Sequence, residues 1–219
     1  MAATINTNTY SLNAQRNLAK NSLGLASAIE RLSSGLRVNS ARDDASGLAR
    51  GMGLEQTARA QAVGIRTLSD TISTAETQDG ALGVLNDVLQ RMGELQAAPS
   101  ASNNAELGLL ATQAGTLATS GGATITITSG STTAQITTAI TAVATQRATH
   151  GATMNNAEFS IQAQQVAYAN TMAARGRIMD ADFAVETSNL SRFQVLQQAG
   201  TAMVAQANAI PQNVLTLLR

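Results

Sequence analysis

Apolar residues recur every three or four positions along most of this chain, which is the spacing of one face of an α-helix. Near the N-terminus the steps alternate between four and three, as in a heptad seam. That first series consists of Leu18, Ser22, Leu25, Ile29, Leu32 and Leu36. Longer series of the same kind follow in both halves of the chain. The pattern predicts an all-α protein whose long helices form an antiparallel coiled-coil bundle.

Helix-breaking residues divide this pattern into elements. Only two prolines occur, Pro99 and Pro211, so long helices are largely uninterrupted. Alternating Thr and Ile residues over 124–128 are typical of a short strand. We therefore expect a helix over 44–97, a short helix over 105–119, a loop with a small strand or β-hairpin over 120–133, and a long helix over 134–178.

The C-terminal stretch carries the most regular seam in the chain. Its steps alternate strictly between three and four, and its positions are Phe193, Leu196, Gly200, Met203, Ala207, Ile210, Val214 and Leu217. From Phe193 to Leu218 there is no charged residue, and the back face carries Gln, Asn and Thr. A helix facing solvent normally carries Lys and Glu there. The amide-rich back face indicates a helix enclosed by other protein.

Both ends of the chain share this interior character, because the first fifteen residues are also uncharged. A pair formed by the N-terminal and C-terminal helices would bury one stripe of each helix and leave the other faces open. Copies of the pair that pack side by side in a repeat that does not close would build a helical filament. We therefore expect the terminal helices to pair, and to become ordered when copies assemble.

The composition excludes most kinds of chemistry. The formal net charge is zero, cysteine is absent, and no apolar run has the length of a membrane span. The single histidine, His150, lies on an apolar seam without a recognisable nucleophile or orienting acid. We interpret it as a packed or interface residue. We expect no enzyme activity, no metal, no cofactor, and no nucleic-acid or membrane partner.

Two long blocks at opposite ends of the chain resemble the signatures of bacterial flagellins. The first is AIERLSSGLRVNSARDDASG, from Ala28 to Gly47, and the second runs from Arg177 to Arg219 and begins RIMDADFAVETSNLSRF. The resemblance implies a short flagellin, a structural subunit that self-assembles into the extracellular filament used for swimming. A hook–filament junction protein, which shares the terminal helices, is the alternative.

The resemblance also implies a domain organisation and a set of partners. Terminal helices form the inner D0 layer of such filaments, here residues 1–43 and 179–219, and residues 44–178 would form the surrounding D1 layer. Export would be through the flagellar type III apparatus without a cleaved signal peptide. The implied partners are further copies of the chain, the filament cap, the hook-associated proteins, and an export chaperone at the C-terminal helix.

Charged residues near the expected junction of the two layers are implied subunit contacts. They are Arg31, Arg37, Arg42, Asp43, Asp44, Arg177, Asp180 and Asp182. The alternatives are solvated surface charges and, for the aspartates, charges at helix starts.

One stretch of the long helix expected over 44–97 is similar to the segment that Toll-like receptor 5 reads in many flagellins. It is LQRMGEL, from Leu89 to Leu95, and its matching positions are Gln90, Arg91, Glu94 and Leu95. Gly93 replaces a residue that is often Arg, so the resemblance is incomplete there.

Overall fold

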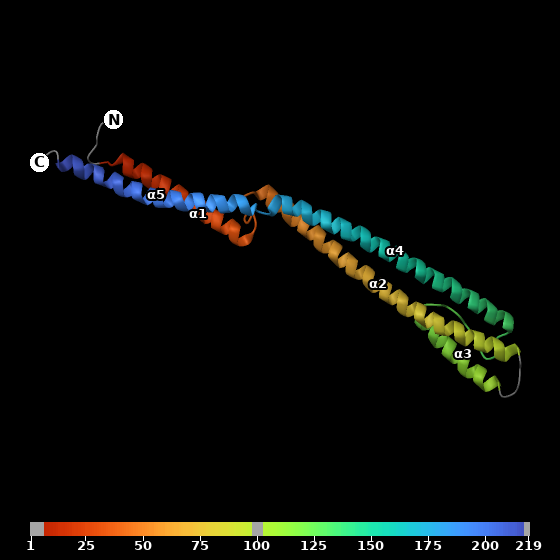
Figure 1. Cartoon of the computed structure of the whole chain (residues 1–219). Coiled ribbons are helices and arrows are strands. Elements are labelled where there is room, and N and C mark those ends of the chain that lie inside the picture. Colours follow the sequence, from red (N-terminus) through yellow and green to blue (C-terminus); the bar gives the residue numbers. More distant parts are fainter. Residues whose placement is uncertain (1–6, 98–102, 217–219) are drawn as a thin grey trace. The chain divides into compact units, whose positions relative to one another are not determined.

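The computed structural model describes residues 7–97 and 103–216, and within these ranges all regular structure is α-helical. The helices are α1 (Thr9–Ser34), α2 (Ala45–Ala97), α3 (Asn103–Ser120), α4 (Thr133–Met179) and α5 (Phe183–Thr216) (Figure 1). The two long helices expected over 44–97 and 134–178 begin and end within one residue of those limits.

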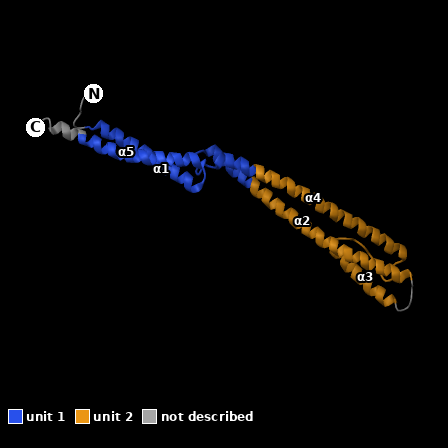
Figure 2. Ribbon diagram, in the orientation of Figure 1, with its two compact units in different colours: residues 1–56, 171–219 blue, residues 57–170 orange. Residues whose placement is uncertain are grey.

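The helices fall into two compact units (Figure 2), one made of residues 1–56 and 171–219 and the other of residues 57–170. In the first unit, α1 and α5 pack against each other. They are antiparallel, because the early Leu18 of α1 lies by Gly200, whereas the later Gly24 lies by Phe193. The predicted pairing of the terminal helices is therefore confirmed.

Aliphatic side chains of three helices form the core of the second unit. On α2 the fully buried positions Leu82, Leu85 and Leu89 are three or four residues apart and share one face. They pack with small and branched residues of α3 and α4, including Leu107, Ala111, Ala114, Ala118, Ile136, Ala139 and Val143. None of the described core residues is aromatic, and the alanines let the helices lie close together.

The segment between α3 and α4 is neither a strand nor a hairpin. Residues 123–128 pair with no other described segment, so the small strand or β-hairpin expected over 120–133 is wrong. The alternation is nevertheless real, because Ala123, Ile125 and Ile127 pack against the core while the threonines between them are exposed. A hydrophobic pattern with a period of two shows only that an extended chain buries every second side chain. A strand also needs a partner, which a single run of this kind does not provide.

A glycine pair ends α3. Gly122 has a φ of 68°, and the N–H of the next residue, Ala123, donates to the carbonyl of Ala118 at 2.8 Å. These features define a Schellman cap, in which glycine takes the left-handed conformation without steric cost. Gly121 is buried just before it, and a Cβ there would collide with Leu82. The Gly-Gly pair thus turns the chain onto the core.

Candidate assembly surface on the terminal helices

Small and polar side chains form much of the contact between α1 and α5. On each helix, a series of buried or partly buried positions alternates between steps of three and four, as in a heptad seam. On α1 they are Ser11, Ala14, Leu18, Asn21, Leu25, Ala28 and Leu32, and on α5 they are Glu186, Leu190, Phe193, Gln197, Gly200, Val204 and Ala207.

The predicted seam positions differ in burial. Those that are buried or partly buried are Leu18, Leu25, Leu32, Phe193, Gly200 and Ala207. Ile29 is 50% exposed, and Leu196 at 40% and Met203 at 62% exposure line an open groove between the two helices. Burial of these last three side chains stays a prediction for the assembled filament. The side chains of Ile210 and Val214, and all of Leu217, lie outside the described part of the chain.

Two reciprocal contacts bring the helices close together. A Cβ on Gly24 would lie 2.6 Å from the ring of Phe193, and a Cβ on Gly200 would lie 3.1 Å from Leu18. Each helix therefore sets a large side chain against a glycine of the other, which lets the two helices approach closely. Leu18, Phe193 and Gly200 were all predicted seam positions, whereas Gly24 was not.

Hydrogen bonds fix the register where the chain ends meet. Ser11 is 6% exposed, and its hydroxyl donates to the side-chain oxygen of Asn208 at 2.7 Å. The side chain of Asn8 donates to the carbonyl of Ala207, also at 2.7 Å. A slipped register would leave these partly buried polar groups unpaired, which costs free energy.

A charge pair fixes the register at the other end of the two helices. The guanidinium of Arg31 lies 3.0 Å from a carboxylate oxygen of Glu186, whose side chain is only 10% exposed. Arg31, an expected subunit contact, is thus held within its own chain.

Beside this charge pair, the segment that follows α1 is also joined by hydrogen bonds to the end of α4. An isolated antiparallel bridge joins Leu36 and Asp180. The guanidinium of Arg37 donates to the carbonyl of Ile178 at 2.7 Å. Arg37 therefore also acts inside the subunit and links the end of α1 to the end of α4.

Three of the predicted aspartates organise turns and helix starts. Asp44 accepts the N–H of Gly47 at 2.8 Å, and Asp182 accepts the first free N–H groups of α5. Asp43 accepts the N–H of Ser40 at 3.0 Å. These backbone hydrogen bonds are the main reason that the pKa values of Asp43 and Asp44 lie below the ordinary aspartate value. The remaining predicted contacts, Arg42, Arg177 and Asp180, are exposed.

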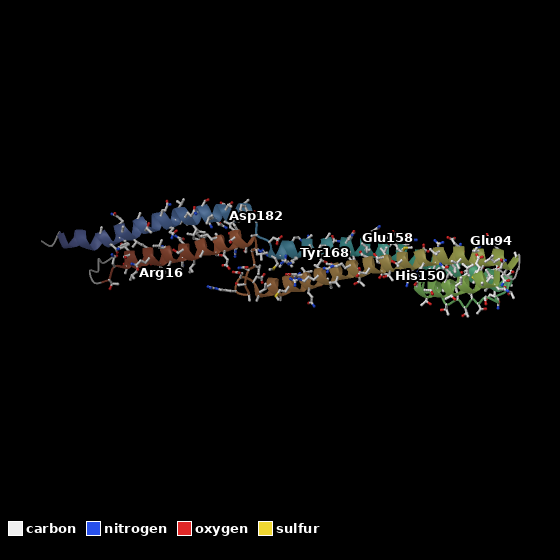
Figure 3. All side chains as sticks on the ribbon, turned by 90° about the horizontal axis from the view of Figure 1, so that it is seen from below. Arg16, Glu94, His150, Glu158, Tyr168 and Asp182 are labelled. Atoms are coloured by element: carbon white, nitrogen blue, oxygen red, sulfur yellow. The ribbon has the colours of Figure 1, made fainter. Side chains whose placement is uncertain are left out.

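The outer faces of the α1–α5 pair carry many large apolar side chains. Figure 3 shows side chains projecting along both helices of this unit. The exposed apolar residues are Tyr10, Leu12, Leu23 and Ile29 on α1, and Phe183, Val185, Val195, Leu196 and Met203 on α5. An apolar groove of about 400 Å³ also runs between the helices, lined in part by Tyr10, Leu18 and Met203. Large apolar side chains thus remain exposed on both helices, which is typical of a surface that becomes buried on association.

The segment that resembles a receptor site is only partly on the surface. Gln90, Arg91 and Glu94 are exposed on α2, and Glu94 is labelled in Figure 3. Arg91 lies 3.2 Å from Glu94 and 3.2 Å from Glu106 of α3. Leu95 is 7% exposed and belongs to the core, so only the polar matching positions lie on the surface.

The only histidine packs against the end of α3. His150 is 8% exposed, and its Nε2 lies 3.2 Å from the carbonyl oxygen of Gly121. Within residues 7–97 and 103–216, no three acidic, histidine or cysteine side chains form a group that could hold a metal. None of the described helices is long and apolar enough to cross a bilayer.

Comparison with protein families matches both ends of the chain. Residues 5–115 match the bacterial flagellin N-terminal helical region, and residues 133–218 match the bacterial flagellin C-terminal helical region. Together these two regions take up most of the sequence.

Individual flagellins align in the same way. The flagellin of Xenorhabdus nematophila is 32% identical over an alignment of 313 residues that spans 100% of both chains. Flagellins of Escherichia coli strain K12 and Bordetella bronchiseptica are 44% and 52% identical over 113 and 95 residues, which are 52% and 43% of this chain. Those stretches are only 23% and 24% of the two relatives, so most of their length has no counterpart in these alignments. With both helical regions matched and one relative aligned end to end, this chain belongs to the flagellin family.

Proposed function

We propose that this chain is the structural subunit that polymerises into the extracellular flagellar filament used for swimming. The observation that carries the proposal is the α1–α5 pair, which leaves large apolar side chains exposed on both helices. One pair cannot cover these outer faces, whereas copies that pack side by side can. A repeated contact that does not close generates a helical polymer. Membership of the flagellin family supports the same function.

Assembly of this kind should be cooperative. Burial of one large apolar side chain contributes about 1.5–3 kcal/mol, whereas association costs roughly 4–15 kcal/mol of lost freedom. Several of the exposed side chains must therefore be buried at once. A subunit that joins an existing end meets several neighbours, and a subunit that meets one other copy does not. Growth on existing filament ends is the expected route.

We assign residues 1–43 and 179–219 to the inner D0 layer and residues 44–178 to the D1 layer. The pairing of α1 with α5 and the separate three-helix core of the second unit support a division into two parts, although the compact units divide at 56/57 and 170/171, inside α2 and α4. Arg42, Arg177 and Asp180 are the residues that we propose for contacts between subunits, because their side chains are exposed. Arg31, Arg37, Asp43, Asp44 and Asp182 would act on assembly by holding the helices in place.

The proposed partners besides further copies are the filament cap, the hook-associated proteins, and an export chaperone at the C-terminal helix. Exposed Val195, Leu196 and Met203 on α5 support the chaperone, because an unassembled subunit needs this surface covered. Toll-like receptor 5, if it binds, would meet the polar side chains of Gln90, Arg91 and Glu94 on α2.

Seeded elongation tests the proposed function. Purified subunits added to filament fragments should extend them, as seen by electron microscopy. Val195→Asp places a charge on the outer face of α5, where the native side chain is 64% exposed. We expect this variant to fold and to lose elongation. Leu109→Asp makes the same kind of change at a residue of α3 that is 75% exposed, and should still elongate.

Two outcomes would contradict these expectations. Normal elongation by Val195→Asp would remove α5 from the assembly surface. A wild-type chain that binds the ends of seeds but never extends them would indicate a hook–filament junction protein.

A further inference from the structure

The extended segment after α3 has backbone groups without partners. Within the described residues, the N–H and C=O groups from Thr124 to Ile127 make no hydrogen bond. The side chains of Ile125 and Ile127 pack against the core of the second unit. One face of the segment is therefore anchored while its edges carry free donors and acceptors. This is the condition of a sheet edge that lacks its second strand.

The surroundings of this segment leave room for such a strand. A groove of about 380 Å³ separates residues 124–127 from the first turns of α4. Thr124, Thr126 and Thr128 are exposed on the outer face. No charged residue occurs between Glu106 and Arg147, so no like-charge repulsion opposes the approach of an identical segment.

The sequence itself says which strand would fit. Residues 124–128 read Thr-Ile-Thr-Ile-Thr, which is the same in both directions. In an antiparallel pair centred on Thr126, Thr faces Thr across the outer face and Ile faces Ile across the inner face. Both faces are therefore matched at every position in one register. β-Branched residues also suit a strand that is buried on one side.

We propose that residues 124–128 of two copies of this chain pair antiparallel about a two-fold axis at Thr126. The pair would be a two-stranded sheet, which is marginal alone but is supported here on the helical core of each copy. The contact is two-fold and self-complementary, so it joins subunits two at a time. It differs from the terminal-helix contact that extends a filament, and it would link two free subunits or subunits of neighbouring filaments.

Cysteine cross-linking tests the register, because the chain contains no cysteine of its own. In the proposed pair the two residues at position 126 face each other with Cβ atoms about 4.5–5.5 Å apart, close to disulfide range. Thr126→Cys should therefore form a disulfide-linked dimer under mild oxidation. Thr124→Cys is the matched control, because its two copies would lie about 13 Å apart along the strands. Mixing Thr124→Cys with Thr128→Cys should restore a heterodimer.

We expect about tenfold more dimer from Thr126→Cys than from Thr124→Cys on a non-reducing gel. Equal dimer from the two single variants, or none from Thr126→Cys, would overturn the pairing. Circular dichroism shows whether each variant is folded, and all three positions are exposed. Seeded elongation of the reduced proteins is measured in parallel. Elongation without registered cross-links rejects only the strand pairing, whereas registered cross-links without elongation reject only the proposed filament function.

Discussion

A side chain at Gly121 would collide with Leu82, which is fully buried, whereas a Cβ on Gly115 of α3 would meet nothing within 4 Å. Glycine is thus required for packing at one position and is a conformational weakness at the other. At Gly115 the cost is backbone entropy in the middle of a helix. Residues of the same type, six positions apart, therefore have opposite effects on stability.

We predict that Gly121→Ala lowers the free energy of unfolding by about 1–3 kcal/mol, because Leu82 cannot move out of a close-packed core. Gly115→Ala should raise it by about 0.5–1 kcal/mol through helix propensity. Urea denaturation followed by circular dichroism measures both. Changes of the same sign in the two variants would show that packing does not distinguish these positions.

The stability of the folded chain at low pH depends on an ion pair between two helices. Arg147 of α4 donates to the two carboxylate oxygens of Asp79 of α2 at 2.8 and 3.2 Å. This hydrogen bonding from the guanidinium is the main reason that the pKa of Asp79 is lowered in the folded chain. An unfolded aspartate has a pKa of about 3.9, so the stabilisation is fully present above that pH. It is lost as the pH falls through the lower folded pKa.

We therefore predict that the melting temperature falls as the pH is lowered below about 4. Asp79→Asn should melt at a lower temperature than the wild type at pH 7 and should show a smaller acid decline. Asp43 and Asp44 also have lowered pKa values, so part of the decline will remain. Asp70→Asn on the same helix is the control. An unchanged acid decline in Asp79→Asn would contradict this assignment.

At the scale of elements, the register of α1 against α5 depends on a few specific contacts. Large side chains meet glycines in the middle, and polar pairs hold both ends. A seam made only of interchangeable leucines could slip by a heptad at little cost, whereas this one would lose every specific contact at once. The pair is therefore specified by complementary positions and not by hydrophobicity alone.

The Arg31–Glu186 pair provides a test of this register. Arg31→Met leaves a largely buried carboxylate without its charge partner and should destabilise the chain by about 2 kcal/mol. The double variant Arg31→Met/Glu186→Leu should recover most of that loss, because both charges are gone. Urea unfolding of the single and double variants forms a double-mutant cycle. Additive losses would mean that the two side chains do not act as a pair.

At the scale of the whole molecule, the two units differ in the size of the apolar side chains that they bury. The second unit encloses Leu82, Leu85 and Leu89 at 0% exposure, whereas the buried apolar residues among the described part of α1 and α5 are Ala28 and Ala207. Local stability follows buried apolar contact. The terminal helices should therefore gain most from assembly, and the expectation that they become ordered in the filament stays a prediction.

Amide hydrogen exchange before and after polymerisation measures this difference. We predict that exchange in α1 and α5 slows by roughly 100-fold or more in filaments, because opening a helix there must also break contacts between subunits. Amides of α2 around Leu85 should change much less. Strong protection of α1 and α5 in dilute monomer, with no further gain in filaments, would contradict the proposed role of these helices.

The sequence by itself determined the helical segments and the character of the chain ends. Helix spacing is a local property, so the limits of α2 and α4 could be predicted from periodicity and from Pro99. The long signature blocks at both ends were sufficient to indicate the family, because their residue order does not depend on tertiary contacts. The absence of charge in the terminal stretches likewise pointed to helices that other protein must enclose.

Only the tertiary structure decided which side of each helix meets its neighbour. Leu18, Phe193 and Gly200 were predicted seam positions, but only the tertiary structure showed that Gly24 receives the ring of Phe193 and that Gly200 receives Leu18. The alternating run at 124–128 showed which side chains turn inward, but a strand depends on a partner that lies elsewhere. Leu95 lies in the same matched segment as the exposed Arg91 and Glu94, and only the structure showed that it belongs to the core. Burial and pairing depend on residues distant in sequence, and local periodicity carries no information about them.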